Sequence, residues 1–351
     1  MNPPRLPLPA LRGALLALLA ALLFGISTPL VQRFGVGIGA FSTAALLYAG
    51  AALAGALLRQ RVEYEARLRR ADAGRLVAMA AFGAVIGPVA LTWGLQHTSG
   101  TSASLMLTLE ALFTALLAWL LYRETMGGRV WTAMLLLVTG GIVLVLDQGR
   151  GSEAQLLGLL AVLLATAAWG VDNTLSRALA ERDPGQVVLA KAALGVVATT
   201  VLAFAFREPV PAAGQALALL IVGATGYGLS LRFYLLAQRA FGAARTGSVF
   251  AFAPFIGAAL AVALGDRSAS GLTAAGSLLM LAGVVLHLAE SHGHDHEHEA
   301  IEHEHAHRHD DGHHDHVHAT MPEGEHSHEH RHAPMRHTHP HVPDAHHMHR
   351  H

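Results

Sequence analysis

Residues 129–147 read RVWTAMLLLVTGGIVLVLD, and this stretch decides which class of protein the chain is. No residue between Trp131 and Leu146 is charged, and Arg129 and Asp147 bracket the run. A soluble helix carries polar residues at helical spacing along one face, a pattern that this stretch lacks. Because about 20 apolar residues are needed to cross the hydrocarbon core of a bilayer, we predict a membrane-spanning helix here.

Nine other stretches have the same character. The additional predicted spans are 12–32, 36–58, 74–95, 99–121, 155–176, 186–206, 214–237, 243–264 and 270–289. The first resembles a signal peptide, but residues 26–30 make a poor cleavage site, so we expect a retained helix. Backbone groups inside a bilayer have to be hydrogen-bonded without water. The predicted fold class is therefore an all-α membrane protein with ten transmembrane helices.

The composition excludes several other classes. Of the 351 residues, 52% are hydrophobic and 14% are charged, whereas an ordinary soluble domain carries about 25% charged residues. The chain has no cysteine, which argues against a disulfide-stapled domain and against a thiolate zinc site. We expect a protein embedded in a lipid bilayer, with no enzymatic activity and no nucleic-acid partner.

Charge and histidine are distributed unevenly along the chain. Residues 1–289 carry a net charge of +8, and residues 290–351 carry −9 with histidine neutral. Of the 25 histidines, all but His97 and His287 lie in this last segment. The near-neutral total thus combines a basic, apolar body with an acidic, histidine-rich tail.

The arginines between the predicted spans indicate the orientation, because cytoplasmic loops are enriched in positive residues. Loops on the side of the N-terminus hold 15 arginines, and loops on the opposite side hold 4. This bias predicts a multi-pass protein of the inner (plasma) membrane with a cytoplasmic N-terminus. With an even number of spans, the tail is cytoplasmic too; a miscount by one span would reverse its side.

The body repeats itself. At an offset of 142 residues Gly141 falls on Gly283, and at an offset of 145 the pair Phe24-Gly25 falls on Trp169-Gly170. The two halves are 12–147 and 155–289, with five spans each, and an odd number of spans inverts the second half relative to the first. Inverted repeats of this kind occur in secondary transporters, with the solute site near the midplane between the halves.

These features resemble the drug/metabolite transporter superfamily, and specifically EamA-type transporters, over residues 12–289. The motifs that carry the resemblance are Phe24-Gly25 and Trp169-Gly170 in the first span of each half, Arg123-Glu124 and Gly265-Asp266 after the fourth span, and Gly140-Gly141-Ile142-Val143 and Ala282-Gly283-Val284-Val285 in the fifth. The resemblance implies an exporter or importer of small solutes that is driven by an ion or counter-solute gradient and needs no nucleotide.

The chain departs from the family pattern at two positions. Pro254 lies in the fourth span of the second half, but Leu112 occupies the matching position in the first half. Asp266 stands where glutamate is more usual. These departures leave the predicted fold unchanged and weaken any inference about the solute, since fold does not name the cargo.

Ionisable residues inside spans are energetically costly and usually face a cavity or a partner. Glu110 lies in the middle of the fourth predicted span, where a carboxylate suits proton exchange or cation binding; the alternative is a packing role. Lys191, the only lysine in the chain, could neutralise Glu110 or hold an anionic solute, or it could extend to the cytoplasmic surface.

Five other residues are candidates for the transport site. Asp172 and Asn173 follow Trp169-Gly170 and either line the cavity or bridge to a nearby arginine. Trp93 and His97 lie at the end of the third predicted span, and Tyr227 lies in the eighth; an interfacial role is the alternative for all three. No residue is expected to act as a catalyst.

The tail, residues 290–351, is predicted to be disordered, because it has too few apolar residues to form a core. Its dominant pattern is His-x-His with carboxylates between, and imidazole suits Zn(II), Ni(II) and Co(II). The predicted metal ligands are His292, His294, His296, His298, His303, His305, His307, His309, His313, His314, His316 and His318. No cofactor is required for transport, and divalent metal on the tail is an additional expectation.

The sequence leaves three functional interpretations. The first is a small-solute exporter whose tail binds or senses divalent metal. The second is a metabolite exporter whose tail has no part in transport. The third is a metal-storage or sensing protein with a membrane anchor, which the duplicated body argues against. The sequence does not determine the cargo, which is a small molecule or an ion, the direction of transport, the coupling ion or the metal that the tail prefers. The oligomeric state also stays open, and a homodimer is one alternative.

Overall fold

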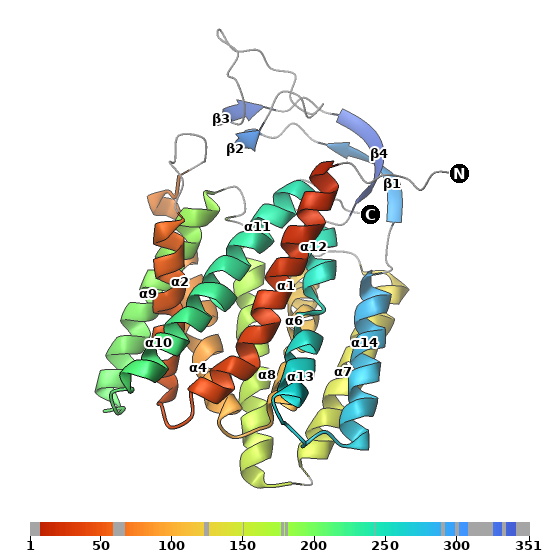
Figure 1. The fold of residues 1–351 in the computed structure, drawn as a ribbon. Helices are drawn as coiled ribbons and strands as arrows, with labels where there is room; N and C mark the ends of the chain where they lie inside the picture. The colour runs from red at the N-terminus through yellow and green to blue at the C-terminus, as the bar shows by residue number, and fades with distance from the viewer. Residues whose placement is uncertain are drawn as a thin grey trace.

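The structure is a computed structural model, and it describes residues 8–58, 67–122, 126–149, 151–176, 179, 182–241, 243–288, 292–298, 302–307, 326–331 and 335–341. The first half contains α1 (Leu8–Phe34), α2 (Ala40–Leu57), η2 (Arg70–Asp72), α3 (Ala73–Met79), η3 (Ala80–Ile86), α4 (Gly87–Leu95), α5 (Gly100–Met106), α6 (Leu109–Tyr122) and α7 (Gly128–Gln148). The second half contains α8 (Glu153–Ser176), α9 (Pro184–Ala205), α10 (Ala213–Val222), η5 (Gly223–Leu229), α11 (Ser230–Phe241), α12 (Ala243–Phe250), α13 (Ala253–Ala263) and α14 (Gly271–Leu288). Figure 1 shows these helices as one bundle.

The ten predicted stretches are all helical. Within the described residues, eight helical segments are long and apolar enough to cross a membrane, and Ala253–Ala263 and Gly271–His287 are shorter apolar helices. Large apolar side chains such as Leu135, Val197 and Leu278 are exposed on the body, as a lipid-facing surface requires. The prediction of an all-helical membrane body is confirmed, and the number of spans stays a proposal.

Irregular helix geometry recurs at matching places in the two halves. The third and eighth predicted spans each contain a π-helix, η3 and η5, whose residues are offset by 143. The fourth and ninth spans each break into two helices, at residues 107–108 and 251–252. Because π-helices are rare, this recurrence supports the predicted two-repeat architecture more strongly than any single motif.

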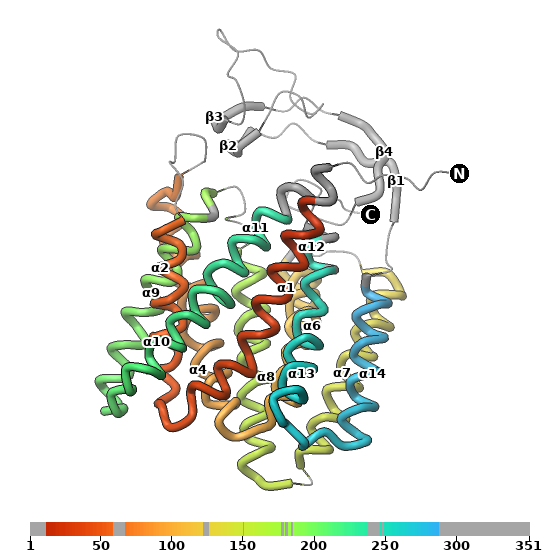
Figure 2. The backbone as a smooth tube through the Cα atoms, in the orientation of Figure 1, coloured from red at the N-terminus to blue at the C-terminus, as the bar shows by residue number. Residues whose placement is uncertain are grey.

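The halves interlock through their first helices. In the first half, α1 packs on α11 and α13 of the second half, and α8 of the second half packs on α4 and α6 of the first. Two further pairs, α2 with α9 and α7 with α14, join equivalent helices. Figure 2 shows α7 and α14 along one side of the body, with α2, α9 and α10 along the other. The core therefore lies between the repeats.

The tail contains four short strands in its described residues. Strand β1 (His292–His298) pairs antiparallel with β4 (Met335–His341), and β2 (Glu302–His307) pairs antiparallel with β3 (His326–Arg331). Seven of the predicted metal ligands lie on β1 and β2; the others, His309, His313, His314, His316 and His318, lie outside the described residues. The prediction of a disordered tail is thus not confirmed for these four ranges. Alternation with a period of two is the repeat of a strand, which physically allows this pairing.

Packing between α7 and α14 yields a test of the fold. A Cβ atom on Gly140 would lie 2.6 Å from Met280 Cγ and 2.8 Å from the Gly276 carbonyl oxygen. We expect Gly140→Ala to lower the free energy of unfolding by about 1–3 kcal/mol, as overpacking does. Gly128→Ala in the same helix is the control, because nothing lies within 4 Å of its added Cβ. Thermal unfolding in detergent measures both; equal stability of the two variants would contradict the packing.

Candidate functional site

A backbone carbonyl inside the bundle organises the centre of the molecule. In the π-helix η3, the N–H of Gly87 donates to the Phe82 carbonyl, five residues earlier. The next donor in this pattern would be Pro88, which has no N–H, so the Gly83 carbonyl has no partner in that ladder. It accepts instead from the Tyr48 hydroxyl and, at 3.0 Å, from Trp169 Nε1.

A buried ion pair packs directly on the same glycine. The Lys191 ammonium of α9 donates to Asp172 Oδ2 of α8, and the two side chains are 12% and 8% exposed. A Cβ on Gly83 would collide with the Asp172 carboxylate and lie 2.7 Å from Lys191 Nζ. Only glycine fits this close approach of three spans. Lys191 therefore pairs with Asp172, whereas the sequence suggested Glu110, an anionic solute or the cytoplasmic surface as its partner.

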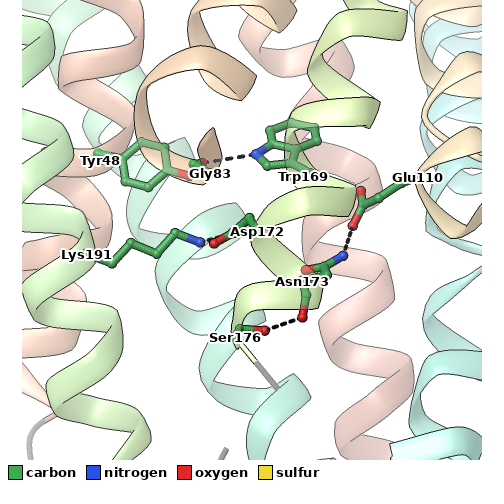
Figure 3. Close-up of polar contacts among 8 residues, drawn as sticks. All are labelled: Tyr48, Gly83, Glu110, Trp169, Asp172, Asn173, Ser176 and Lys191. Atoms are coloured by element: carbon green, nitrogen blue, oxygen red, sulfur yellow. Dashed lines mark hydrogen bonds and ion pairs between the residues drawn. The ribbon is translucent and has the colours of Figure 1, made fainter. Parts of the chain in front are cut away.

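Glu110 lies on the other side of α8, as Figure 3 shows. It is the second residue of α6, directly after the break in the fourth span, and its Oε1 accepts a hydrogen bond from Asn173 Nδ2 at 2.7 Å. Asn173 is exposed and Glu110 is half-buried. The pair joins the first repeat to the second.

Aromatic rings from both halves gather beside these polar groups. The Phe24 ring centroid lies 6.1 Å from that of Trp169 and 6.0 Å from that of Tyr227, both edge-on. Tyr227 also lies 5.8 Å from Tyr48. Phe24 and Trp169 occupy equivalent positions in the two repeats, so their contact marks the pseudo-twofold axis. The motif pair found in the sequence was the signal for this cluster, but Tyr48 and Gly83 gave no signal.

A separate pocket lies where α1, α4 and α13 end. Its volume is about 690 Å³, and the residues that line it include Gln32, Arg33, Gln96, His97, Gly100 and Asp266. His97 Nδ1 lies 2.7 Å from the Trp93 carbonyl oxygen, and the two rings stack with centroids 4.1 Å apart. His97 and Trp93 therefore belong to this end of the body, which we call the pocket end.

Asp266 ties the two halves together at the pocket end. Its Oδ2 accepts from the Thr101 N–H and hydroxyl at 2.9 and 2.8 Å, and its Oδ1 accepts from Ser268. Burial would raise the pKa of the Asp266 carboxyl, but these hydrogen bonds lower it below its usual range. The carboxylate therefore stabilises the fold at neutral pH, and this contribution is lost as the pH falls through the lowered pKa.

The predicted candidates thus fall into two groups. Glu110, Asn173, Asp172, Lys191 and Tyr227 lie around the C-terminal third of α8, a region that we call the central site. His97 lines the pocket, and Trp93 stacks on it at the pocket end. Among the described residues, no group of three or more His, Asp or Glu residues could hold a metal ion. What the central site offers chemically is one carboxylate with an amide partner and one neutralised carboxylate, set among aromatic rings.

Comparisons with known proteins agree with this architecture. The model of the "EamA-like transporter family" matches twice, over residues 11–146 and 156–289. A relative from Methanothermobacter thermautotrophicus, described as an uncharacterized transporter, is 32% identical over 129 residues, which are 36% of this chain and 37% of that protein. A solved structure titled "Crystal structure of protein" aligns over 78% of this chain and 94% of its own, with a TM-score of 0.57 and 19% identity. This last likeness concerns the fold alone.

The ion pair predicts an asymmetry between single and double variants. Lys191→Met leaves the Asp172 carboxylate buried without its partner, and such a loss costs about 3–5 kcal/mol. We expect a clear fall in the unfolding midpoint for Lys191→Met, and recovery of most of it when Asp172→Asn is added. Chemical denaturation of the purified variants in detergent measures both midpoints. Strictly additive losses in the double variant would show that the two side chains do not interact.

Proposed function

Since the chain belongs to the EamA-like transporter family, we propose that it is a secondary transporter that exports small solutes across the inner (plasma) membrane. Glu110 is the residue that binds the coupling proton or cation. The observation that carries this proposal is the pairing of Glu110 with Asn173 of the other repeat, at the break in the fourth span.

A carboxyl group inside a membrane is stable when it is neutral or when a cation is beside it, because an isolated buried charge is costly. Glu110 can change between the neutral form and the cation-paired form, because its partner is a neutral amide rather than a fixed cation. Asp172 is different, because Lys191 already neutralises it. We therefore assign exchange to Glu110 and a positioning role to the Asp172–Lys191 pair.

The break in the fourth span supports the same assignment. Around residues 107–108 the backbone makes three-residue turns, with the Glu110 N–H donating to the Leu107 carbonyl at 3.1 Å. Discontinuous spans at the midplane are typical of solute and coupling-ion sites in transporters with inverted repeats. Glu110 thus stands beside a break in its span, and we propose that proton or cation binding there is linked to a change in helix packing.

For orientation and for the tail, the support comes from the sequence. The excess of arginine in the loops on the N-terminal side favours cytoplasmic termini, so the histidine-rich tail faces the cytoplasm. We propose that the tail binds Zn(II), Ni(II) or Co(II) through its His-x-His runs. Acidic residues between the histidines add negative charge that attracts these cations. The tail would then buffer or sense metal beside the transport domain.

Glu110→Gln should abolish coupling while the protein still folds, because glutamine keeps the shape and the hydrogen bond but cannot ionise. In proteoliposomes that enclose a pH-sensitive dye, we expect proton flux evoked by a panel of amino acids, organic cations and divalent metals. The flux should fall about tenfold or more in the variant. Glu153→Gln, in the exposed first turn of α8, is the control. Undiminished flux in Glu110→Gln would contradict the assignment.

Removal of the tail separates its role from transport. Full-length protein should bind Zn(II) or Ni(II) at pH 7.5, and binding should weaken below about pH 6.5, where imidazole is protonated. Protein ended after Glu290 should lose this binding, as measured by calorimetric titration. If solute flux is equal with and without the tail, the tail has no direct part in transport. If the two proteins bind metal equally, the tail is not the metal site.

A further inference from the structure

Three small residues close the bundle between the central site and the pocket. A Cβ on Gly257 of α13 would lie 2.9 Å from Ser104 Oγ of α5 and 2.8 Å from the Gly25 carbonyl oxygen of α1. The helices α1, α5 and α13 therefore touch at these positions, and we call Gly25, Ser104 and Gly257 the seam. It joins two helices of the first repeat to one of the second.

The hydroxyl of Ser104 is anomalous in this environment. Ser104 is 0% exposed, and its Oγ has no hydrogen-bond partner among the described residues. Burying a hydroxyl without a partner costs free energy, because its hydrogen bonds with water are lost. A group of this kind is accounted for when another conformation of the protein exposes it to water or to a solute.

The seam also lies on the direct line between the two polar regions. Gly100 and Ala261, which line the pocket, precede Ser104 and follow Gly257 by one helical turn on α5 and α13. Glu110 lies six residues beyond Ser104 along the same span. The seam therefore lies between the central site and the pocket, and its helices are in contact in this structure.

The pseudo-symmetry of the repeats identifies the helix contact that would close the opposite end of the body. The repeat places α12 where α5 stands and α13 where α6 stands, so the counterpart of the α5–α13 contact is a contact between α6 and α12. In this structure α5 packs on α13, whereas α6 packs on α8 and α7, and α12 packs on α1 and α11. Within the described part of the chain, α6 and α12 form no comparable contact. The two ends of the body therefore differ: the pocket end is closed and the opposite end is not closed by the equivalent helices.

We propose that the solute path from the central site to the pocket runs through the seam, and that Ser104 lines this path when α5 separates from α13. The proposal rests on the transport function but on neither the identity of the solute nor the role of Glu110. Because Gly25 and Gly257 have no side chains, their helices approach closely enough to exclude solute when the seam is closed. Ser104 supplies a hydroxyl that hydrogen-bonds water or solute when the seam opens.

Labelling of single cysteines tests this directly, because the natural chain contains no cysteine. Ser104→Cys replaces one small side chain with a similar one. The probe is a charged, membrane-impermeant methanethiosulfonate, applied to right-side-out and inside-out membrane vesicles. Val36→Cys, at an exposed pocket residue, identifies the side of the membrane that the pocket faces. Ala103→Cys is the matched buried control, since Ala103 is also 0% exposed on α5.

We expect Ser104→Cys to react from the same side as Val36→Cys, and about tenfold or more faster than Ala103→Cys, because a minor open state exposes it. Reaction from the side opposite to Val36→Cys, or at the rate of Ala103→Cys, would overturn the proposal. So would no reaction at all in protein that labels fully once denatured. None of these outcomes depends on which solute is exported.

Discussion

The Gly83 carbonyl lies inside the bundle without a backbone partner in the π-helix ladder, because Pro88 occupies the position from which an N–H would be donated. A membrane interior offers no water to take the place of that donor. Tyr48 and Trp169 donate to it instead, which connects the second, third and sixth predicted spans at one atom. The absence of a side chain on Gly83 then allows the Asp172–Lys191 pair to approach. The meeting of Tyr48, Trp169 and the Asp172–Lys191 pair at Gly83 thus depends on this one carbonyl and on the missing side chain beside it.

The scaffold is nearly symmetric, whereas the charges are not. At an offset of 145 the counterpart of Asp172 is Ser27, which packs against Gly226 much as Asp172 packs against Gly83. Ser27 donates to the Phe24 carbonyl at 2.6 Å and needs no counter-ion. The two repeats therefore contain equivalent close approaches, and of these two only the one at Gly83 holds an ion pair. The ion pair thus makes two equivalent positions of the repeats chemically different.

At the pocket end, the helices are held together by close contacts between small residues and by hydrogen bonds, rather than by large side chains. Gln32 Nε2 donates to the Leu95 and Thr98 carbonyls at 2.9 Å each, and Asp266 holds Thr101. Hydrogen bonds of this kind are individually modest in net energy, so they can be exchanged for water when helices separate. Glycine at Gly83, Gly140 and Gly257 lets spans of different repeats approach closely, because a Cβ there would collide with the neighbouring helix.

The membrane class, the helical fold, the two-repeat architecture and the presence of Glu110 and Lys191 inside spans could all be predicted from the sequence. These features depend on hydrophobic run length and periodicity, which are properties of contiguous residues. The partner of Lys191, the role of Gly83 and Tyr48, and the seam at Ser104 and Gly257 could not. Each depends on which helices touch, and residues far apart along the chain, such as Tyr48 and Trp169, meet only after the repeats interlock. The sequence by itself determined that the chain spans a membrane as a duplicated bundle; the tertiary structure decided which buried polar groups satisfy one another, because that is a matter of distance between helices and not of order along the chain.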